Sequence, residues 1–397
     1  MEKKKIMVIF GTRPEATKMA TVIKELKKYS DQFETLITVT GQHNEQLYQV
    51  LNNFDITPDI DLKIMKENQS LVYITNAAIK GLDEIIQKEK PDFILVHGDT
   101  QTSFAGALTG FLNKIPVAHI EAGLRSFNRY SPWPEEINRK LVDVTSNILF
   151  APTRKNYINL LNEGYEKENI FITGQTAIDA ALSSYDENHI FKNEILNKID
   201  FKKNRVIFVT AHRRENYGEP MHNMFNAIRK IADDNQDVLI IYPVHLSPVV
   251  RKTADKILKN HERIILTEPI DYLDSINLQA KSYFIMSDSG GLQEEASVFK
   301  KPLILMRDTT ERPEAVETGF VFLAGTNTND IYNLSKKLLN DKEYYNKISN
   351  FKNPFGDGKA SERIVKILSY YFKFTSELPE EFGENKKWSI KDSLYFL

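Results

Sequence analysis

Residues 93–139, FILVHGDTQTSFAGALTGFLNKIPVAHIEAGLRSFNRYSPWPEEINR, decide the fold of this chain. Two apolar runs, 93–96 and 117–120, are typical of buried strands, and a helix-like segment of small and apolar residues separates them. Such strands are expected to be parallel neighbours, and ligands bind beyond the carboxyl ends of parallel strands. Asp99 follows the first run and Glu121 follows the second. We therefore expect these two acidic side chains to lie close together.

A third acidic position follows at Glu135 and Glu136, directly after a Pro-Trp-Pro turn where a helix is expected to begin. Each acidic residue has a structural alternative, because Asp at a strand end often caps a helix and Glu in a first turn complements the helix dipole. Three converging carboxylates favour a chemical role, since neighbouring carboxyl groups push their pKa values apart and can then act as acid and base. The stretch therefore predicts acid–base chemistry.

The composition indicates a globular protein of two domains. The length of 397 residues exceeds one ordinary core, and the net charge of −2 predicts neither nucleic acid nor an anionic membrane as a partner. The absence of cysteine excludes disulfides and thiolate chemistry and fits a reducing compartment. The first apolar run is too short for a signal peptide, and no apolar run reaches the roughly 18 residues of a membrane span. We therefore expect a cytoplasmic protein.

Apolar runs alternate with helical segments on both sides of a polar, helical stretch at 174–204. Before this stretch we expect further strands at 6–10, 35–40, 148–150 and 170–173. After it we expect strands at 205–210, 238–242, 263–266, 283–286, 302–305 and 321–323. This alternation predicts an α/β fold of two Rossmann-like domains, 1–174 and 175–360, with a ligand cleft between them and a helical tail, 361–397, packing back on the N-terminal domain.

The second half contains a candidate phosphate site in the segment SDSGGLQEEA, 287–296. Gly290 and Gly291 at a helix start let backbone N–H groups approach a phosphate, and Ser289 precedes them. Glu295, one turn later, is a suitable acceptor for ribose hydroxyls, so a nucleoside diphosphate is favoured over a plain turn. Arg312, just before a proline at another helix start, is expected beside the same site.

Two other segments place cations at strand ends. Arg13 and Lys18 follow the first strand near a helix start, a common place for an anion. His212 precedes two arginines, and it has no second histidine at metal-binding spacing, so we favour an anion-facing loop over a metal site. For His245 a structural and a binding role are equally open. The chain has neither a GxGxxG fingerprint nor a GxxxxGK[ST] loop, so neither nicotinamide chemistry nor NTP hydrolysis is indicated.

Ordered motifs over nearly the whole chain carry a family resemblance. These motifs are GTRPEATKMA, QHNEQL, VHGDT, HIEAGLRS, YSPWPEEINR, TAHRRENYG, SDSGGLQEEA and RDTTERPEAVETG. The chain resembles the bacterial non-hydrolysing UDP-N-acetylglucosamine 2-epimerases. The resemblance implies a GT-B-like fold with the active site in the interdomain cleft, a homodimer, no metal and no NAD. It also implies interconversion of UDP-GlcNAc and UDP-ManNAc, for cell-surface polysaccharides such as capsule or teichoic acid.

The resemblance also implies roles for individual residues. In this family, elimination of UDP gives 2-acetamidoglucal, and UDP then adds back with protonation of the other face of C2. By motif, the proton-transfer carboxylates are Asp99, Glu121 and Glu135, and His212 assists the departure of UDP. The diphosphate-side positions are Arg13, Lys18, Ser289, Gly290, Gly291 and Arg312, and Glu295 is placed on the ribose.

One departure from the family concerns activation by UDP-GlcNAc bound beside the active site. Gln42, His43, Arg213 and His245 match the positions of that allosteric site. Asn44 and Asn68 replace two basic positions, and a hydrogen bond from a charged side chain is worth about 1.5–3 kcal/mol. We therefore expect weakened or altered activation. Three other functions stay open from the sequence: an epimerase for a 6-deoxy UDP-N-acetylhexosamine, a UDP-sugar glycosyltransferase of the same architecture, and an inactive nucleotide-sugar sensor.

Overall fold

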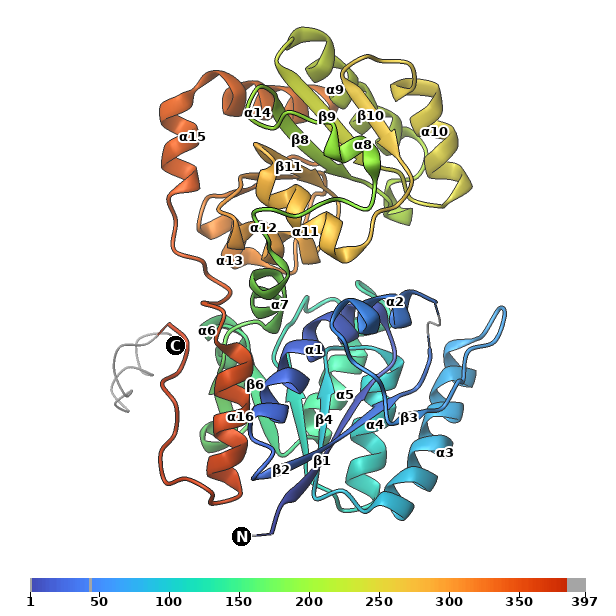
Figure 1. Cartoon of the computed structure of the whole chain (residues 1–397), viewed down its shortest axis with the longest axis vertical. Helices are drawn as coiled ribbons and strands as arrows, with labels where there is room; N and C mark the ends of the chain where they lie inside the picture. The colour runs from blue at the N-terminus through green and yellow to red at the C-terminus, as the bar shows by residue number, and fades with distance from the viewer. Residues whose placement is uncertain (1, 43–44, 384–397) are drawn as a thin grey trace. The chain divides into compact units, whose positions relative to one another are not determined.

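The computed structural model describes residues 2–42 and 45–383 (Figure 1). The chain forms two compact units, each built on its own parallel sheet. Unit 1 comprises Met1–Ala180 and the chain from Gly356 onward, and unit 2 comprises Ala181–Phe355. The expected α/β fold with two Rossmann-like parallel sheets is therefore confirmed. Over the described residues, none of the helices combines the length and the apolar character needed to cross a membrane.

Unit 1 contains a seven-stranded sheet in the order β3-β2-β1-β4-β5-β6-β7. Its strands are β1 (Lys4–Phe10), β2 (Phe33–Val39), β3 (Ile60–Asp61), β4 (Phe93–His97), β5 (Val117–Ile120), β6 (Ile148–Ala151) and β7 (Ile170–Ile172). Its helices are α1 (Arg13–Lys28), α2 (Glu45–Asn53), α3 (Leu71–Glu89), α4 (Gln101–Leu112), α5 (Glu135–Thr145), α6 (Arg154–Asn162), the short η1 (Lys167–Asn169), most of α7 (Thr176–Ser184) and α16 (Ala360–Tyr371).

Strands β4 and β5 are parallel neighbours, with Val96 opposite His119 and His97 opposite Ile120. Every residue of both strands is buried, as expected for a parallel sheet covered by helices on both faces. The prediction that the two runs are parallel neighbouring strands is confirmed, and a Cβ on Gly98, the residue before Asp99, would stand 3.9 Å from Oε1 of Glu121.

Unit 2 contains a six-stranded sheet in the order β10-β9-β8-β11-β12-β13. Its strands are β8 (Arg205–Thr210), β9 (Val238–Pro243), β10 (Ile264–Thr267), β11 (Phe284–Ser287), β12 (Leu303–Leu305) and β13 (Val321–Leu323). Its helices are α8 (Glu194–Asn197), η2 (Arg214–Asn216), α9 (Glu219–Asp234), α10 (Pro248–Leu258), α11 (Tyr272–Lys281), α12 (Gly291–Val298), α13 (Pro313–Glu317), α14 (Thr328–Asn340) and α15 (Lys342–Ser349).

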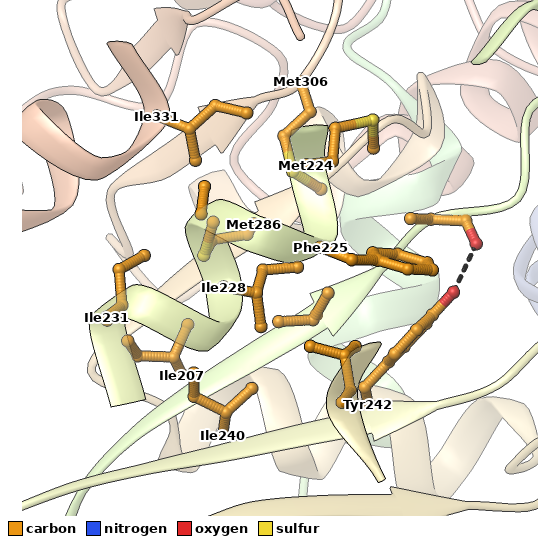
Figure 2. Close-up of a cluster of buried hydrophobic side chains, with 14 of the residues drawn as sticks. Ile207, Met224, Phe225, Ile228, Ile231, Ile240, Tyr242, Met286, Met306 and Ile331 are labelled. Atoms are coloured by element: carbon orange, nitrogen blue, oxygen red, sulfur yellow. Dashed lines mark hydrogen bonds between the residues drawn. The ribbon is translucent and has the colours of Figure 1, made fainter. Parts of the chain in front are cut away.

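The core of unit 2 lies between helix α9 and the sheet (Figure 2). Met224, Phe225 and Ile228 of α9 pack against Ile240 and Tyr242 of β9. Burying such side chains stabilises the fold by about 1.5–3 kcal/mol each. This packing fixes the strand ends that carry His212 and Asp288.

Helix α16 returns the chain to unit 1 and packs beside α1 (Figure 1). Asp179 accepts the backbone N–H of Ala360 (3.2 Å) and of Ser361 (2.8 Å), which caps the first turn of α16. The Ser361 hydroxyl also bonds to that of Thr21 on α1 (2.9 Å). The two-residue strand β3 was not predicted, because so short a segment carries no periodic signal.

Candidate active site

The carboxylates at the ends of β4 and β5 are each paired with a cation of unit 1. Nη2 of Arg139 lies 2.5 Å from Oδ2 of Asp99, and Nε of the same guanidinium lies 3.2 Å from it. The ammonium of Lys18 donates to Oε2 of Glu121, and both of these side chains are largely buried. Lys18, for which the sequence predicts a place beside a diphosphate, is therefore bonded to one of the predicted acid–base residues.

Glu121 is held in an unusual backbone conformation. Its φ is +75°, in the left-handed region that non-glycine residues seldom adopt. The ring of His97, at the end of β4, faces its carboxylate at 3.6 Å from Nε2 to Oε2. Burial lowers the pKa of His97 to about 3, so this imidazole is neutral at physiological pH. Sequence reasoning missed His97, because a histidine ending a buried strand resembles an ordinary core residue.

The two acidic residues that begin α5 differ in their surroundings. Glu136 is buried, and its carboxylate accepts the N–H groups of Ser126 (2.9 Å) and Phe127 (3.0 Å) and one bond from Arg139 (3.1 Å). Glu136 therefore holds the loop after β5. Glu135 is half-buried and is the first residue of the helix.

A buried polar network lies behind Asp99. Nε2 of His119 donates to the carbonyl of Gly98 (2.8 Å), and Nδ1 lies 2.6 Å from Oδ1 of Asp143. Burial alone would raise the pKa of the Asp143 carboxyl, but His119 and Arg125 hold it below its usual value. The network fixes the peptide that precedes Asp99.

The loop that begins α1 is tied to the loop that begins α4. The carboxylate of Glu15 accepts bonds from the N–H groups of Gly11 (3.1 Å) and Thr12 (2.8 Å) and from the hydroxyls of Thr12 (2.7 Å), Thr100 (2.7 Å) and Ser103 (2.8 Å). Arg13 is the first residue of α1 and is half-buried. Glu15 therefore joins the loop that leads to Arg13 to the loop that carries Asp99.

In unit 2, the ends of β8 and β11 meet around Asp288. Oδ2 of this fully buried residue accepts the backbone N–H groups of His212 (2.9 Å) and Arg213 (2.8 Å) and a bond from Asn216 (3.1 Å). Its Oδ1 makes no hydrogen bond to the described residues and lies 3.7 Å from Nδ1 of His212. Asp288 therefore shapes the loop that presents His212.

The backbone before His212 is fixed from the core. The hydroxyl of Tyr242 donates to the carbonyl of Ala211 (2.7 Å), the bond drawn dashed in Figure 2. Burial and the nearby carboxylate of Asp288 both raise the pKa of this tyrosine. His212 also stacks on His245, with ring centroids 5.3 Å apart.

The predicted phosphate loop opens helix α12 as expected. Gly290 is the N-cap and Gly291 the first residue of the helix, and the N–H of Ser289 bonds to the Ser287 hydroxyl (2.9 Å). A Cβ on Gly290 would stand 2.8 Å from Nη1 of Arg312, whereas a Cβ on Gly291 would meet no atom of the described chain within 4 Å. A side chain at Gly290 would therefore have to displace the end of a charged side chain, whereas one at Gly291 would not, and Arg312 lies beside this loop.

The candidate ribose residue is held by a neighbouring helix. Nε2 of Gln279, on α11, donates to Oε2 of Glu295 (2.7 Å). This bond fixes one carboxylate oxygen of Glu295, the residue for which the sequence predicts contact with a ribose.

The candidate allosteric residues lie in both units. Gln42 in unit 1 is buried and accepts the Thr102 hydroxyl at its Oε1 (2.9 Å). In unit 2, Nε of Arg213 donates to the carbonyl of Asp288 (3.1 Å). Asn68 is exposed with φ +53°. His43 and Asn44 lie outside the described residues.

No cluster of three or more potential metal ligands occurs in the part of the chain that the structure describes. The residues that the structure adds to the predicted site are His97, Glu15 and Asp288. Two of them had a sequence signal: Thr12 and Glu15 form the T-x-x-E pattern of a capping box, and Asp288 follows a buried strand as Asp99 does.

Comparisons with known proteins agree with this architecture. The sequence model of a family described as UDP-N-acetylglucosamine 2-epimerase matches residues 24–369. The UDP-N-acetylglucosamine 2-epimerase of Bacillus subtilis is 49% identical over 382 residues, which cover 96% of this chain and 99% of that protein. The enzyme of the same name from Campylobacter jejuni is 48% identical, over 92% of this chain and 97% of that protein.

Solved structures show the same fold. The structure of S. aureus MnaA with UDP has a TM-score of 0.88 and 49% identity, and the match covers 96% of this chain and all of that one. The UDP-GlcNAc 2-epimerase of Neisseria meningitidis bound to UDP-GlcNAc has a TM-score of 0.85 and 46% identity, over 92% of this chain and 99% of that one. The resemblance carried by the sequence motifs is confirmed, and this chain belongs to the family of UDP-N-acetylglucosamine 2-epimerases.

Proposed function

We propose that this protein reversibly inverts C2 of UDP-N-acetylglucosamine to give UDP-N-acetylmannosamine, by elimination and re-addition of UDP. Family membership supports the reaction type, and one observation carries the assignment of residues. Glu121 and Asp99 stand at the ends of adjacent strands, each bonded to a cation, at the edge of the sheet where parallel strands place ligands.

The chemistry explains why carboxylates and a cationic nucleotide site are both required. The hydrogen on C2 has no adjacent carbonyl to acidify it, so direct removal and return is too slow. In the proposed path a carboxylate takes the C2 proton as the C1–O bond breaks, and the bonding electrons leave with UDP. The products of this step are 2-acetamidoglucal and UDP. Re-addition of UDP at C1, with a proton delivered to the other face of C2, gives the epimer.

The residues divide between the two halves of this reaction. Asp99, Glu121 and Glu135 are proposed to move protons at C2. The Lys18 ammonium donates a hydrogen bond to the Glu121 carboxylate. In unit 2, His212 is proposed to assist the departing diphosphate, since Asp288 accepts its backbone N–H and the second carboxylate oxygen lies 3.7 Å from Nδ1 of the imidazole. The proposed UDP contacts are Arg13, Ser289, Gly290, Gly291, Glu295 and Arg312.

Proton NMR in deuterated water tests this function. Purified protein with UDP-GlcNAc, and no acceptor or metal, is expected to give UDP-ManNAc carrying deuterium at C2. Glu121→Gln is expected to lower the rate of deuterium incorporation by about 10²–10⁴-fold, the range of one acid–base group. Lys140→Gln, which alters a half-exposed cation paired with Glu163, serves as the matched control and should keep wild-type turnover. An unchanged spectrum would contradict the proposal. If the protein converted only a 6-deoxy UDP-N-acetylhexosamine, the substrate would be that sugar instead of UDP-GlcNAc.

We also propose that the protein is a homodimer and that its product supplies N-acetylmannosamine to cell-surface polysaccharides. Helices α4 and α5 pack together and expose Phe111 (61%), Leu112 (63%) and Val144 (65%). Exposed apolar side chains on two helices that pack together are consistent with an interface. Light scattering should give twice the chain mass of 45.8 kDa, and Val144→Glu should shift the protein to the monomer.

A further inference from the structure

The carboxylate of Glu311 packs against Gly290, the N-cap residue of helix α12. Its Oε1 is 2.5 Å from the point where a Cβ on Gly290 would stand. Gly290 is the N-cap of this eight-residue helix, whose first N–H groups have no partner within the helix. An anion therefore already occupies the side-chain face of Gly290, the first residue of the glycine pair.

Three guanidinium groups surround this carboxylate. Nη1 of Arg312 lies 2.9 Å from Oε1, Nη1 of Arg307 lies 3.1 Å from Oε2, and Nη2 of Arg213 lies 3.9 Å from Oε1. Burial alone would raise the pKa of Glu311, but these arginines lower it to about 2. The group is therefore ionised over the whole physiological pH range. Arginine side chains and the N–H groups at a helix start are both favourable ligands for a phosphate group.

We propose that Glu311 is a built-in anion in the diphosphate site, which a nucleotide must displace in order to bind. The inference rests on the proposed function, which places the diphosphate of UDP at Ser289, Gly290 and Gly291. A carboxylate and a phosphate cannot share the space above Gly290, and two anions there would repel each other. Binding therefore exchanges the ion pairs of Glu311 for those of the diphosphate.

The arginines keep other partners when Glu311 leaves. Nε of Arg312 donates to Glu294 (2.6 Å), and Nε of Arg307 donates to Glu215 (3.1 Å). Nε of Arg213 bonds to the backbone carbonyl of Asp288 (3.1 Å). Each guanidinium thus stays in place while one of its faces is released. Loss of the Glu311 charge should therefore strengthen nucleotide binding rather than scatter the cations.

This arrangement suits a reaction in which UDP must be released and recaptured at C1. Interactions that bind substrate and transition state equally do not raise kcat. Because the Glu311 carboxylate competes for the three guanidinium groups, it lowers the affinity of the site for the diphosphate of the bound substrate.

Isothermal titration calorimetry with UDP, uridine and inorganic pyrophosphate tests the proposal on the full-length protein. Glu311→Gln is expected to lower the Kd of UDP and of pyrophosphate about tenfold, the lower end of the worth of one charge-assisted hydrogen bond. The Kd of uridine, which has no phosphate, should not change. Glu262→Gln is the matched control, because it removes an exposed carboxylate that pairs with Arg263 before β10 and contacts none of these three arginines, so the Kd of UDP should not change.

Each outcome has a clear meaning. An unchanged or higher Kd of UDP for a folded Glu311→Gln protein would overturn the proposal, as would equal effects on UDP and uridine. If this variant does not fold, a crystal structure of the wild-type protein with UDP decides: the carboxylate must have left Gly290, and its presence there beside bound UDP would refute the inference. Wild-type protein that binds no UDP would instead contradict the proposed function.

Discussion

Replacing Glu15 tests how the two loops of unit 1 are held together. Glu15→Ala removes an acceptor from five hydrogen bonds and leaves the N–H groups of Gly11 and Thr12 buried without a partner. Each orphaned group costs about 1–3 kcal/mol, so the free energy of unfolding should fall by about 2–6 kcal/mol. Activity should fall as well, since the loop before Arg13 and the loop that carries Asp99 lose their shared anchor.

Glu15→Gln should be tolerated. Its amide oxygen can accept the two backbone N–H groups, and its amide nitrogen then faces the hydroxyls of Thr100 and Ser103. Ser103 can turn to accept, because its hydroxyl already has the carbonyl of His97 as another acceptor. Burial raises the pKa of Glu15, so the carboxylate charge is not what stabilises the fold. We expect a change in unfolding free energy within about 1 kcal/mol.

The pH dependence gives a second readout of the same substitution. Because the folded-state pKa of Glu15 is raised, its contribution to stability is fully present below the unfolded pKa and is lost as the pH rises through the folded pKa. Glu15→Gln should therefore gain stability relative to wild type as the pH rises from the ordinary carboxyl pKa of 4.5 into the neutral range. Urea unfolding followed by circular dichroism measures both quantities. Equal losses in the two variants, or a loss below about 1 kcal/mol for Glu15→Ala, would refute the reasoning.

Further substitutions probe the other contacts. Asp288→Asn keeps an oxygen for the backbone but takes the carboxylate from His212, so kcat should fall about tenfold or more while the Kd of UDP measured by calorimetry stays unchanged. Asp143→Asn removes the carboxylate that contacts the buried His119, and urea unfolding at neutral pH should show a loss of about 3–5 kcal/mol in the free energy of unfolding. Because the pKa of Asp143 is lowered in the folded protein, the contribution of its carboxylate to stability is lost as the pH falls through the folded-state pKa. The difference between this variant and wild type should therefore shrink in acid. Asn68→Arg should strengthen activation of UDP-ManNAc turnover by added UDP-GlcNAc, at a backbone cost of about 1–2 kcal/mol for a positive φ.

The strands were predictable from the sequence because parallel strands buried on both faces are continuous apolar runs. The runs at 93–96 and 205–210 fall within one residue of β4 and β8. The positions of the acidic residues at strand ends were predictable for the same reason. Strand β3 was missed, because its pairing with β2 depends on tertiary contacts and not on its own two residues.

The partners of the site residues were not predictable, because they come from distant parts of the chain. Lys18 and Glu121 are separated by 103 positions, and nothing in either segment indicates that they bond. The sequence placed Lys18 and Arg312 as ligands for an anion, whereas in the structure a carboxylate of the protein already occupies each of them. The sequence shows which residues are cationic, but it does not show which of them pair with carboxylates of the same chain.

That internal neutralisation bears on how the site works. Lys18 is bonded to Glu121, Arg139 to Asp99, and Arg312 to Glu294 and Glu311. A diphosphate therefore gains affinity only to the extent that its ion pairs exceed those it replaces. The cations need little reorganisation on binding, since their partners already hold them, and preorganised charges stabilise a transition state at low cost. Among these carboxylates Glu311 is the one that packs against Gly290, so we expect its substitution, unlike that of Glu294, to tighten UDP binding without displacing Arg312.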